Sequence, residues 1–250
     1  MARQTGIIKL KGKIGDLSFY KTKDGHLARE KGGVDGDRIK NDPAFIRTRE
    51  NGAEFGSSAS SGKLLRDTIR PLMMRASHGR VTSTMTTPLT TLKNEDTTSA
   101  RGQRNVATAL TDNPTSIQYL NGFNFNNRSI LGSVLYKPVN VDEPAGEFEI
   151  ENLVPINDIA APAGATHFSF TGGWADIDFD STDRELVLTN TFNGPLDAVS
   201  TNVILTSGTP PAVGGTQLYL LLLEFFQEVN GVQYSLKNGA YNCLSVVQVA

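Results

Sequence analysis

The sequence predicts an α+β protein in which an N-terminal β-ribbon and short helices precede an antiparallel β-sandwich. Three observations predict this class. Apolar and polar residues alternate near the N-terminus, apolar residues take a helical spacing in the next part, and short strand patterns separated by turn residues follow. These changes of pattern divide the 250 residues into a basic arm at 1–41, a helical section at 42–122 and an acidic sandwich domain at 123–250.

The arm has the pattern of a small antiparallel ribbon. Residues 6–11 and 17–20 alternate between apolar and polar, and residues 26–29 form the returning strand. Between them, Asp24-Gly25 indicates a hairpin, because this pair suits a tight turn. An isolated hairpin is only marginally stable in water, so we expect these strands to need a further sheet.

Two signals define the helical section. Asp42-Pro43 is typical of a helix start, with Asp as the N-cap and Pro in the first turn. Residues 63–74 place their apolar side chains on one stripe, and Pro71 predicts a kink there. Further helices are expected over 82–98 and 99–109, with a break over 56–61.

The rest of the chain predicts short strands separated by Pro, Gly, Asn and Asp. Eight or nine strands at this spacing indicate an antiparallel sandwich of the immunoglobulin-like type. The longest apolar run, 218–223, is far shorter than the roughly 20 residues of a membrane span. The candidate strands are 133–136, 147–152, 166–171, 174–179, 185–188, 202–205, 218–228, 231–236 and 244–249.

Charge is divided unevenly along the chain. Residues 1–104 carry 20 Lys+Arg and 11 Asp+Glu, a formal +9, whereas residues 105–250 carry 4 Lys+Arg and 15 Asp+Glu, a formal −11. The near-neutral total of −2 hides this separation. Complementary charges steer association and fix its register, so the two parts can bind each other within one chain or between neighbours.

The candidate functional site is therefore an assembly interface on the arm. Its apolar side chains need a partner surface, and its lysines supply the charge. Lysines interleaved with aromatic residues also suit phosphate contacts and base stacking, but the acidic half of the chain makes a protein partner the better match. The basic ribbon extends to Lys21, Lys23, Arg29 and Lys31. The predicted interface residues are Ile7, Ile8, Leu10, Phe19, Tyr20, Lys9, Lys11 and Lys13.

The sequence contains no motif for catalysis. His26, His78 and His167 lie far apart along the chain and outside any paired-ligand pattern, and no nucleophile elbow or phosphate loop occurs. Cys243 is the only cysteine, which excludes an internal disulfide, and its apolar neighbours predict a buried, inert thiol. We expect no enzymatic activity and no cofactor.

One cluster resembles a metal site. Asp176, Asp178, Asp180 and Asp183 supply the oxygen ligands that hard cations such as Ca²⁺ prefer. The segment is not an EF-hand loop, since Ser181 stands where that loop requires Gly. In a strand the alternating carboxylates share one face, so a solvated strand face is the preferred interpretation and a weak surface cation site is the alternative.

Together these features favour a structural subunit that assembles with itself into a filament or tube. Strand exchange at a sheet edge and head-to-tail charge pairing supply the contacts, and an open head-to-tail contact generates a helical polymer. A phage virion or injection-apparatus component is one alternative, and a nucleic-acid-associated protein is another. The first residues lack an apolar signal region, so we expect synthesis in the cytoplasm, with release or assembly needed for any extracellular or virion role.

Several segments resemble a family of uncharacterised proteins from Bacteroidota genomes. The resemblance covers 41–45, 47–51, 226–231 and 236–240 besides the opening stretch, whose residues 6–33 are GIIKLKGKIGDLSFYKTKDGHLAREKGG. It implies shared ancestry but carries no activity and no catalytic residues to this chain.

Overall fold

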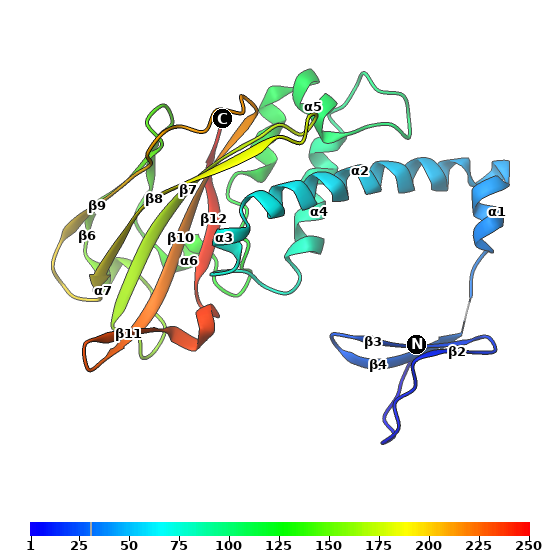
Figure 1. The fold of residues 1–250 in the computed structure, drawn as a ribbon, viewed down its shortest axis with the longest axis horizontal. Coiled ribbons are helices and arrows are strands. Elements are labelled where there is room, and N and C mark those ends of the chain that lie inside the picture. The colour runs from blue at the N-terminus through cyan, green and yellow to red at the C-terminus, as the bar shows by residue number, and fades with distance from the viewer. Residues whose placement is uncertain (31) are drawn as a thin grey trace. The chain divides into compact units, whose positions relative to one another are not determined.

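The computed structural model describes residues 1–30 and 32–250, without the side chains of residues 237 and 238, and divides the chain into two units, Met1–Arg49 and Glu50–Ala250 (Figure 1). About 30% of the chain is helical and about 34% is strand, so neither class dominates and the fold is α+β with antiparallel sheets. Lys31, predicted as part of the basic ribbon, lies outside the described residues.

The first unit contains an antiparallel sheet in the order β1-β4-β3-β2. Thr22 pairs with Gly25, so β3 and β4 form the predicted hairpin with a two-residue turn. The predicted strand over 6–11 is wrong, because these residues lie in the connection between β1 and β2. The strands are β1 (Ala2–Arg3), β2 (Gly12–Ile14), β3 (Leu17–Thr22) and β4 (Gly25–Glu30).

Short helices follow the sheet, and α1 (Gly36–Asn41) is the first of them. The Asp42 carboxylate then accepts a hydrogen bond from the Ala44 amide at 2.9 Å, which starts the 3-10 helix η1 (Pro43–Phe45). The predicted helix start at Asp42-Pro43 is therefore confirmed.

Helix α2 (Ile46–Thr68) passes without interruption through the predicted break at 56–61, which is wrong. The reason lies in tertiary packing rather than in local preference. Ser58 is buried, and its hydroxyl donates to the Glu54 carbonyl at 3.2 Å inside the helix. Gly62 faces Leu89 so closely that a Cβ on the glycine would lie 2.9 Å from the Leu89 Cδ1 atom. The glycine therefore serves a close helix–helix approach instead of ending the helix.

Three further helices and a 3-10 segment complete the helical layer. Pro71 lies in the first turn of α3, directly after α2 ends, so the predicted kink is confirmed. The helix expected over 99–109 begins later, because the Asn105 side chain caps it by accepting from the Thr108 amide at 2.8 Å. The bounds are α3 (Arg70–Met73), α4 (Val81–Lys93), α5 (Val106–Asp112) and η2 (Pro114–Leu120).

Two antiparallel sheets make up the rest of the second unit. One has the order β11-β10-β7-β8 with β12 also paired to β10, and the other has the order β5-β6-β9. The predicted strand at 133–136 is wrong, since α6 occupies its first half, and the strands predicted at 166–171 and 174–179 are one strand, β7. The elements are α6 (Leu131–Val134), β5 (Asn140–Asp142), β6 (Glu147–Leu153), α7 (Pro155–Asp158), β7 (His167–Ile177), β8 (Arg184–Pro195), β9 (Thr201–Thr206), β10 (Thr216–Val229), β11 (Val232–Ser235), η3 (Leu236–Gly239) and β12 (Cys243–Val249).

The larger sheet is the middle layer of the second unit, between the helices and the three-stranded sheet (Figure 1). Alternate residues of β10 explain this position: Leu218, Leu220 and Leu222 join the core beneath the helices. Tyr219 and Leu221 face the other way, into the core between the two sheets. The continuous apolar run of β10 is thus a strand buried on both faces, and helices and sheets share one body across the predicted boundary at 123.

Candidate assembly interface

The N-terminal sheet does not form a buried core within its own unit. None of the residues described within Met1–Arg49 is buried. A sheet normally buries one apolar face against another layer, and within this unit no such layer exists among the described residues. Neither face of the sheet is therefore covered by a second layer of its own unit.

One face of this sheet carries a group of apolar side chains beside the charged or titratable residues Glu30, Lys21 and His26. Residues paired directly across antiparallel strands share a face, and Ile14 pairs with Leu17 while Phe19 pairs with Ala28. Ile14 is 60% exposed and Leu17 is 45% exposed, and Phe19 is half-buried. Ala2 extends this face through its pairing with Ala28. The result is a short, partly exposed stripe of apolar side chains on a face that it shares with Glu30 and Lys21.

The opposite face is basic. Lys13 and Arg29 both pair with Ser18 of β3, one from each side, so the two cations lie on the same face. Tyr20 and Leu27 form the next pair, and Arg3 pairs with Leu27. The Arg29 guanidinium lies 5.5 Å from the centroid of the Tyr20 ring, a cation–π contact.

The connection between β1 and β2 carries an exposed apolar tip. Ile7 is 103% exposed and Ile8 is 80% exposed. The Gln4 side chain closes the base of this loop, because its Oε1 accepts from the Leu10 amide at 2.8 Å and its Nε2 donates to the Leu10 carbonyl at 3.3 Å. Gln4 thus pairs with Leu10 as a neighbouring strand would, and the Lys9 ammonium donates to the Gln4 carbonyl.

The structure separates the predicted interface residues into three places. Lys13 and Tyr20 come together on the basic face, whereas Phe19 lies on the apolar face. Ile14 and Leu17 are not among the predicted interface residues, although the alternation along β3 and its partners could have shown them. The other predicted residues, Ile7, Ile8, Lys9, Leu10 and Lys11, belong to the loop.

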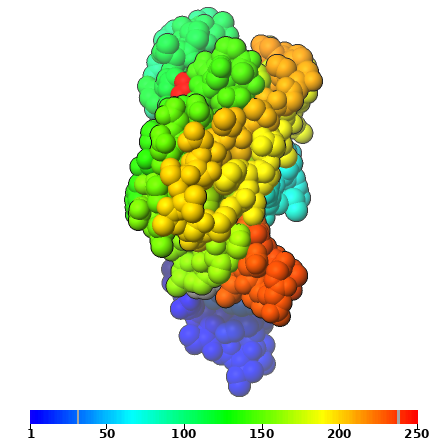
Figure 2. Space-filling model, turned by 90° about the vertical axis from the view of Figure 1, so that its left-hand side faces the viewer, coloured from blue at the N-terminus to red at the C-terminus, as the bar shows by residue number. Residues whose placement is uncertain are grey.

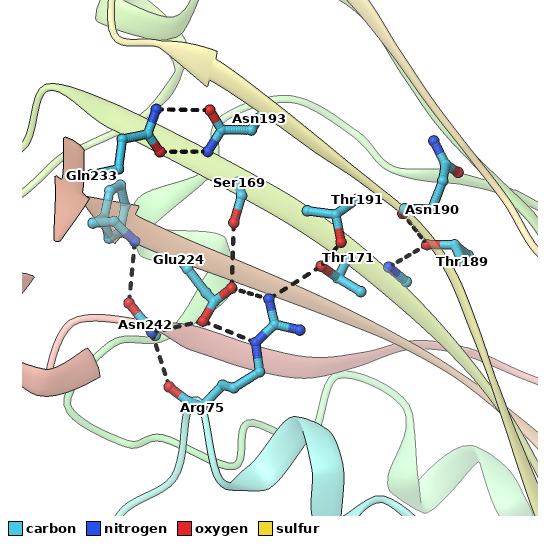
Figure 3. A network of polar contacts seen from close by, with 12 residues as sticks. Arg75, Ser169, Thr171, Thr189, Asn190, Thr191, Asn193, Glu224, Gln233 and Asn242 are labelled. Atoms are coloured by element: carbon cyan, nitrogen blue, oxygen red, sulfur yellow. Dashed lines mark hydrogen bonds and ion pairs between the residues drawn. The ribbon is translucent and has the colours of Figure 1, made fainter. Parts of the chain in front are cut away.

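An ion pair between the partly exposed Arg75 and the buried Glu224, together with its neighbours, forms a polar network in the second unit (Figure 3). The Glu224 carboxylate on β10 accepts from the Arg75 guanidinium, with a distance of 3.1 Å to Nε. It also accepts from the Ser169 hydroxyl at 3.3 Å and from the Asn242 amide at 3.4 Å. The same Asn242 amide donates to the Arg75 carbonyl at 2.9 Å. These bonds fasten the turn after α3 to the sheet, which is a structural role.

A second buried pair joins α2 to α4. The Lys93 ammonium donates to the Glu54 carboxylate, and both side chains are at most 10% exposed. This hydrogen bond lowers the pKa of Glu54, assisted by the Gly102 amide, which donates to the carboxylate at 2.8 Å. The pair is internal to the helical layer and offers no open catalytic group.

The remaining titratable candidates do not assemble into a reactive site. His26, His78 and His167 lie on different segments, and His167 Nε2 lies 3.4 Å from Glu228. Cys243 is buried, as predicted, and burial raises its pKa to about 11. In the described ranges, no group of three or more His, Cys, Asp or Glu side chains is arranged to hold a metal ion.

The aspartate cluster is divided by the end of β7. Asp176 is 0% exposed, and its carboxylate accepts from the amides of Gly214 and Gly215, each at 2.8 Å. Asp178 follows the strand, and its carboxylate accepts from the Asp180 amide, which lowers the pKa of Asp178. The interpretation of a shared, solvated strand face is therefore wrong, because the strand ends at 177 and Asp176 fixes a loop.

Comparison with models of protein families, with curated proteins and with solved structures finds no match for this chain. None of the helices in 1–30 and 32–250 has the length and apolar content needed to cross a bilayer.

Proposed function

We propose that this protein is a structural subunit that assembles with copies of itself into a filament or tube through its N-terminal arm. The observation that carries the proposal is the two-faced sheet of Met1–Arg49, which has an exposed apolar stripe on one face, a basic opposite face and no buried residue among those described. The proposal includes no catalytic step and no cofactor.

The apolar face supplies part of the required binding energy. Full burial of a large apolar side chain contributes about 1.5–3 kcal/mol, and Ile14, Leu17 and Phe19 are already partly buried, so together they supply roughly 2–4 kcal/mol. Association costs about 4–15 kcal/mol in lost translational and rotational freedom. These three side chains alone therefore do not offset this cost, and a stable contact also needs the loop with Ile7 and Ile8 and the charged face.

Charge supports a contact between copies. Residues 1–49 carry 12 Lys+Arg and 6 Asp+Glu, a formal +6, and residues 50–250 carry 12 Lys+Arg and 20 Asp+Glu, a formal −8. A basic surface on one copy and an acidic surface on the next form a head-to-tail contact, which gives an open helical polymer unless the rotation closes a ring.

The proposal also includes strand exchange between copies and an immunoglobulin-like topology for the sandwich. Residues 6–11 alternate like a strand but have no strand partner in the described arm, apart from the Gln4 side chain. Short edge strands such as β11, which pairs only with β10, are typical acceptors for such a segment.

Electron microscopy of the purified full chain tests the proposal directly. We expect regular filaments or tubes from the full chain and none from a variant that lacks residues 1–31. Light scattering should show slower assembly in 1 M salt, where the Debye length is about 3 Å, while preformed polymers persist. A truncated chain that still forms the same polymers would contradict the role of the arm.

A nucleic-acid-associated role is the second candidate, and the basic face favours it. Lys13, Arg29 and Arg3 surround Tyr20, a combination suited to phosphate contacts and base stacking. Salt-sensitive retention of single-stranded DNA or RNA by the monomeric chain would support it. Closed rings or shells in the micrographs would instead support a virion or injection-apparatus component.

A further inference from the structure

We infer that the outer face of the three-stranded sheet β5-β6-β9 receives the basic face of the arm from a second copy of the chain. The inference rests on the proposed self-assembly and names the two surfaces that meet. The receiving surface lies on the side of the second unit that faces the viewer in Figure 2.

Strand register defines the receiving face. Phe148 and Ile150 of β6 point into the core, so their neighbours along the strand point outward. Asp142 of β5 is directly opposite Glu147, and Ile204 of β9 is directly opposite Glu149. The outward side chains are Asn140, Asp142, Glu147, Glu149, Glu151, Asn202, Ile204 and Thr206.

The charges on this face are all negative. Asp142, Glu147, Glu149 and Glu151 are its charged residues, and β5, β6 and β9 contain no Lys or Arg. Across the part of the chain that the structure describes, these four carboxylates make no side-chain hydrogen bond or ion pair. Like charges directly opposite on neighbouring strands are destabilising, as in the pair of Asp142 and Glu147. The fold therefore maintains a repulsive surface that a basic partner would relieve.

The basic face of the arm also carries its charges at regular strand positions. On the arm, Lys13 and Arg29 lie on two strands with one strand between them, which places them about 10 Å apart across the sheet. On the receiving face, Glu147 and Glu149 are two residues apart on one strand, which places them about 7 Å apart. Both surfaces are thus regular sheet faces with charges at strand spacing. Each has an apolar centre, Tyr20 with its neighbours on the arm and the 47% exposed Ile204 on the receiving face.

We assign the receiving face to the arm of a second copy, because every copy carries both the basic face and the acidic receiving face. The formal +6 of residues 1–49 and the formal −8 of residues 50–250 repeat in every copy. Every subunit then uses one donor face and one receiving face. Complementary potentials of this kind raise association rates by one to three orders of magnitude, so their loss should be visible in kinetics.

Charge reversal on the full chain tests the receiving face. Glu147→Lys with Glu149→Lys should slow assembly at low salt by on the order of tenfold or more. Asp67→Lys with Asp180→Lys is the matched control, since these two exposed carboxylates lie elsewhere and the change in net charge is equal. The control should assemble faster than the receiving-face variant, and thermal unfolding should show that both are folded.

A mixing experiment identifies the partner of the receiving face. Lys13→Glu with Arg29→Glu reverses the donor face, and this chain should also fail to assemble alone. A mixture of donor-reversed and receiver-reversed chains should assemble again, because each arm then meets a body of opposite charge. If a reversed chain does not fold, Glu149→Gln and Lys13→Gln replace the reversals and should each slow assembly at low salt.

The outcomes separate the two proposals. If the unmodified chain never polymerises, self-assembly itself is wrong. If the unmodified chain polymerises but the receiver-reversed or neutralised chain behaves like the control, self-assembly stands and the receiving face is wrong. Failure of the mixture to assemble, when both reversed chains are folded, also overturns the pairing of these two faces.

Discussion

Two glycines of α2 should respond to the same substitution with opposite signs. Gly56 and Gly62 are both inside the continuous helix Ile46–Thr68. Nothing lies within 4 Å of a Cβ built on Gly56. A Cβ on Gly62 would lie 2.9 Å from the Leu89 Cδ1 atom and 3.3 Å from the Arg66 Nη1 atom. Replacement of each glycine by alanine therefore separates helix propensity from packing.

The magnitudes decide the sign at each position. Alanine is about 1 kcal/mol more favourable than glycine inside a helix. Gly56→Ala should gain this amount, because the added methyl group meets only solvent. At Gly62 the same gain is opposed by overpacking, which costs about 1–3 kcal/mol. Arg66 can move away, but Leu89 is 0% exposed and held within the core, so we expect a net loss of about 1 kcal/mol.

Urea unfolding followed by the fluorescence of Trp174, the only tryptophan, measures both variants. A difference of about 2 kcal/mol between them corresponds to roughly 4–8 °C in Tm for a unit of this size. Equal stabilisation by Gly56→Ala and Gly62→Ala would show that α2 and α4 are not packed as closely as the structure places them.

Three further predictions concern the buried polar groups. Lys93→Met should cost about 3–5 kcal/mol at neutral pH, because it leaves the Glu54 carboxylate buried without a cation, and adding Glu54→Gln should recover part of the loss. The native pair lowers the pKa of Glu54. The free energy of unfolding that the pair contributes is therefore present above the ordinary carboxyl pKa and is lost as the pH falls. Urea unfolding of the native and Lys93→Met chains at several pH values should accordingly give free energies of unfolding that converge in acid. Arg75→Met should cost less, about 1–3 kcal/mol in the same assay, because the Arg75 side chain is 37% exposed while Glu224 is buried. Cys243, with a pKa raised to about 11, should react with iodoacetamide at pH 8 only as fast as the chain unfolds, and rapid labelling of the native protein would contradict its burial.

Local signals in the sequence decided several elements by themselves. The hairpin turn, the Asp42 cap and the kink at Pro71 depend on backbone preferences of a few residues, and each occurs close to the predicted position, although the two turn residues are Lys23 and Asp24 and Gly25 begins β4. The apolar run at 218–223 likewise predicted a long strand, because a strand that is buried on both faces is apolar at successive positions.

Long-range packing decided the elements that the sequence pattern misplaced. Residues 6–11 alternate like a strand, but the Gln4 side chain takes the place of the strand partner. The Gly- and Ser-rich part of α2 remains helical because Leu89, far along the chain, packs against Gly62.

The candidate site could be predicted only in part from the sequence. Composition and charge, which can be counted along the sequence, place the site on the arm. The division of Phe19 and Tyr20 between an apolar and a basic face follows from alternation along β3. The addition of Ile14, Leu17 and Arg3 to those faces, and the gathering of carboxylates opposite one another on β5 and β6, depend on strand register. Register is set by contacts between distant segments, so only the tertiary structure could show which charges share a surface.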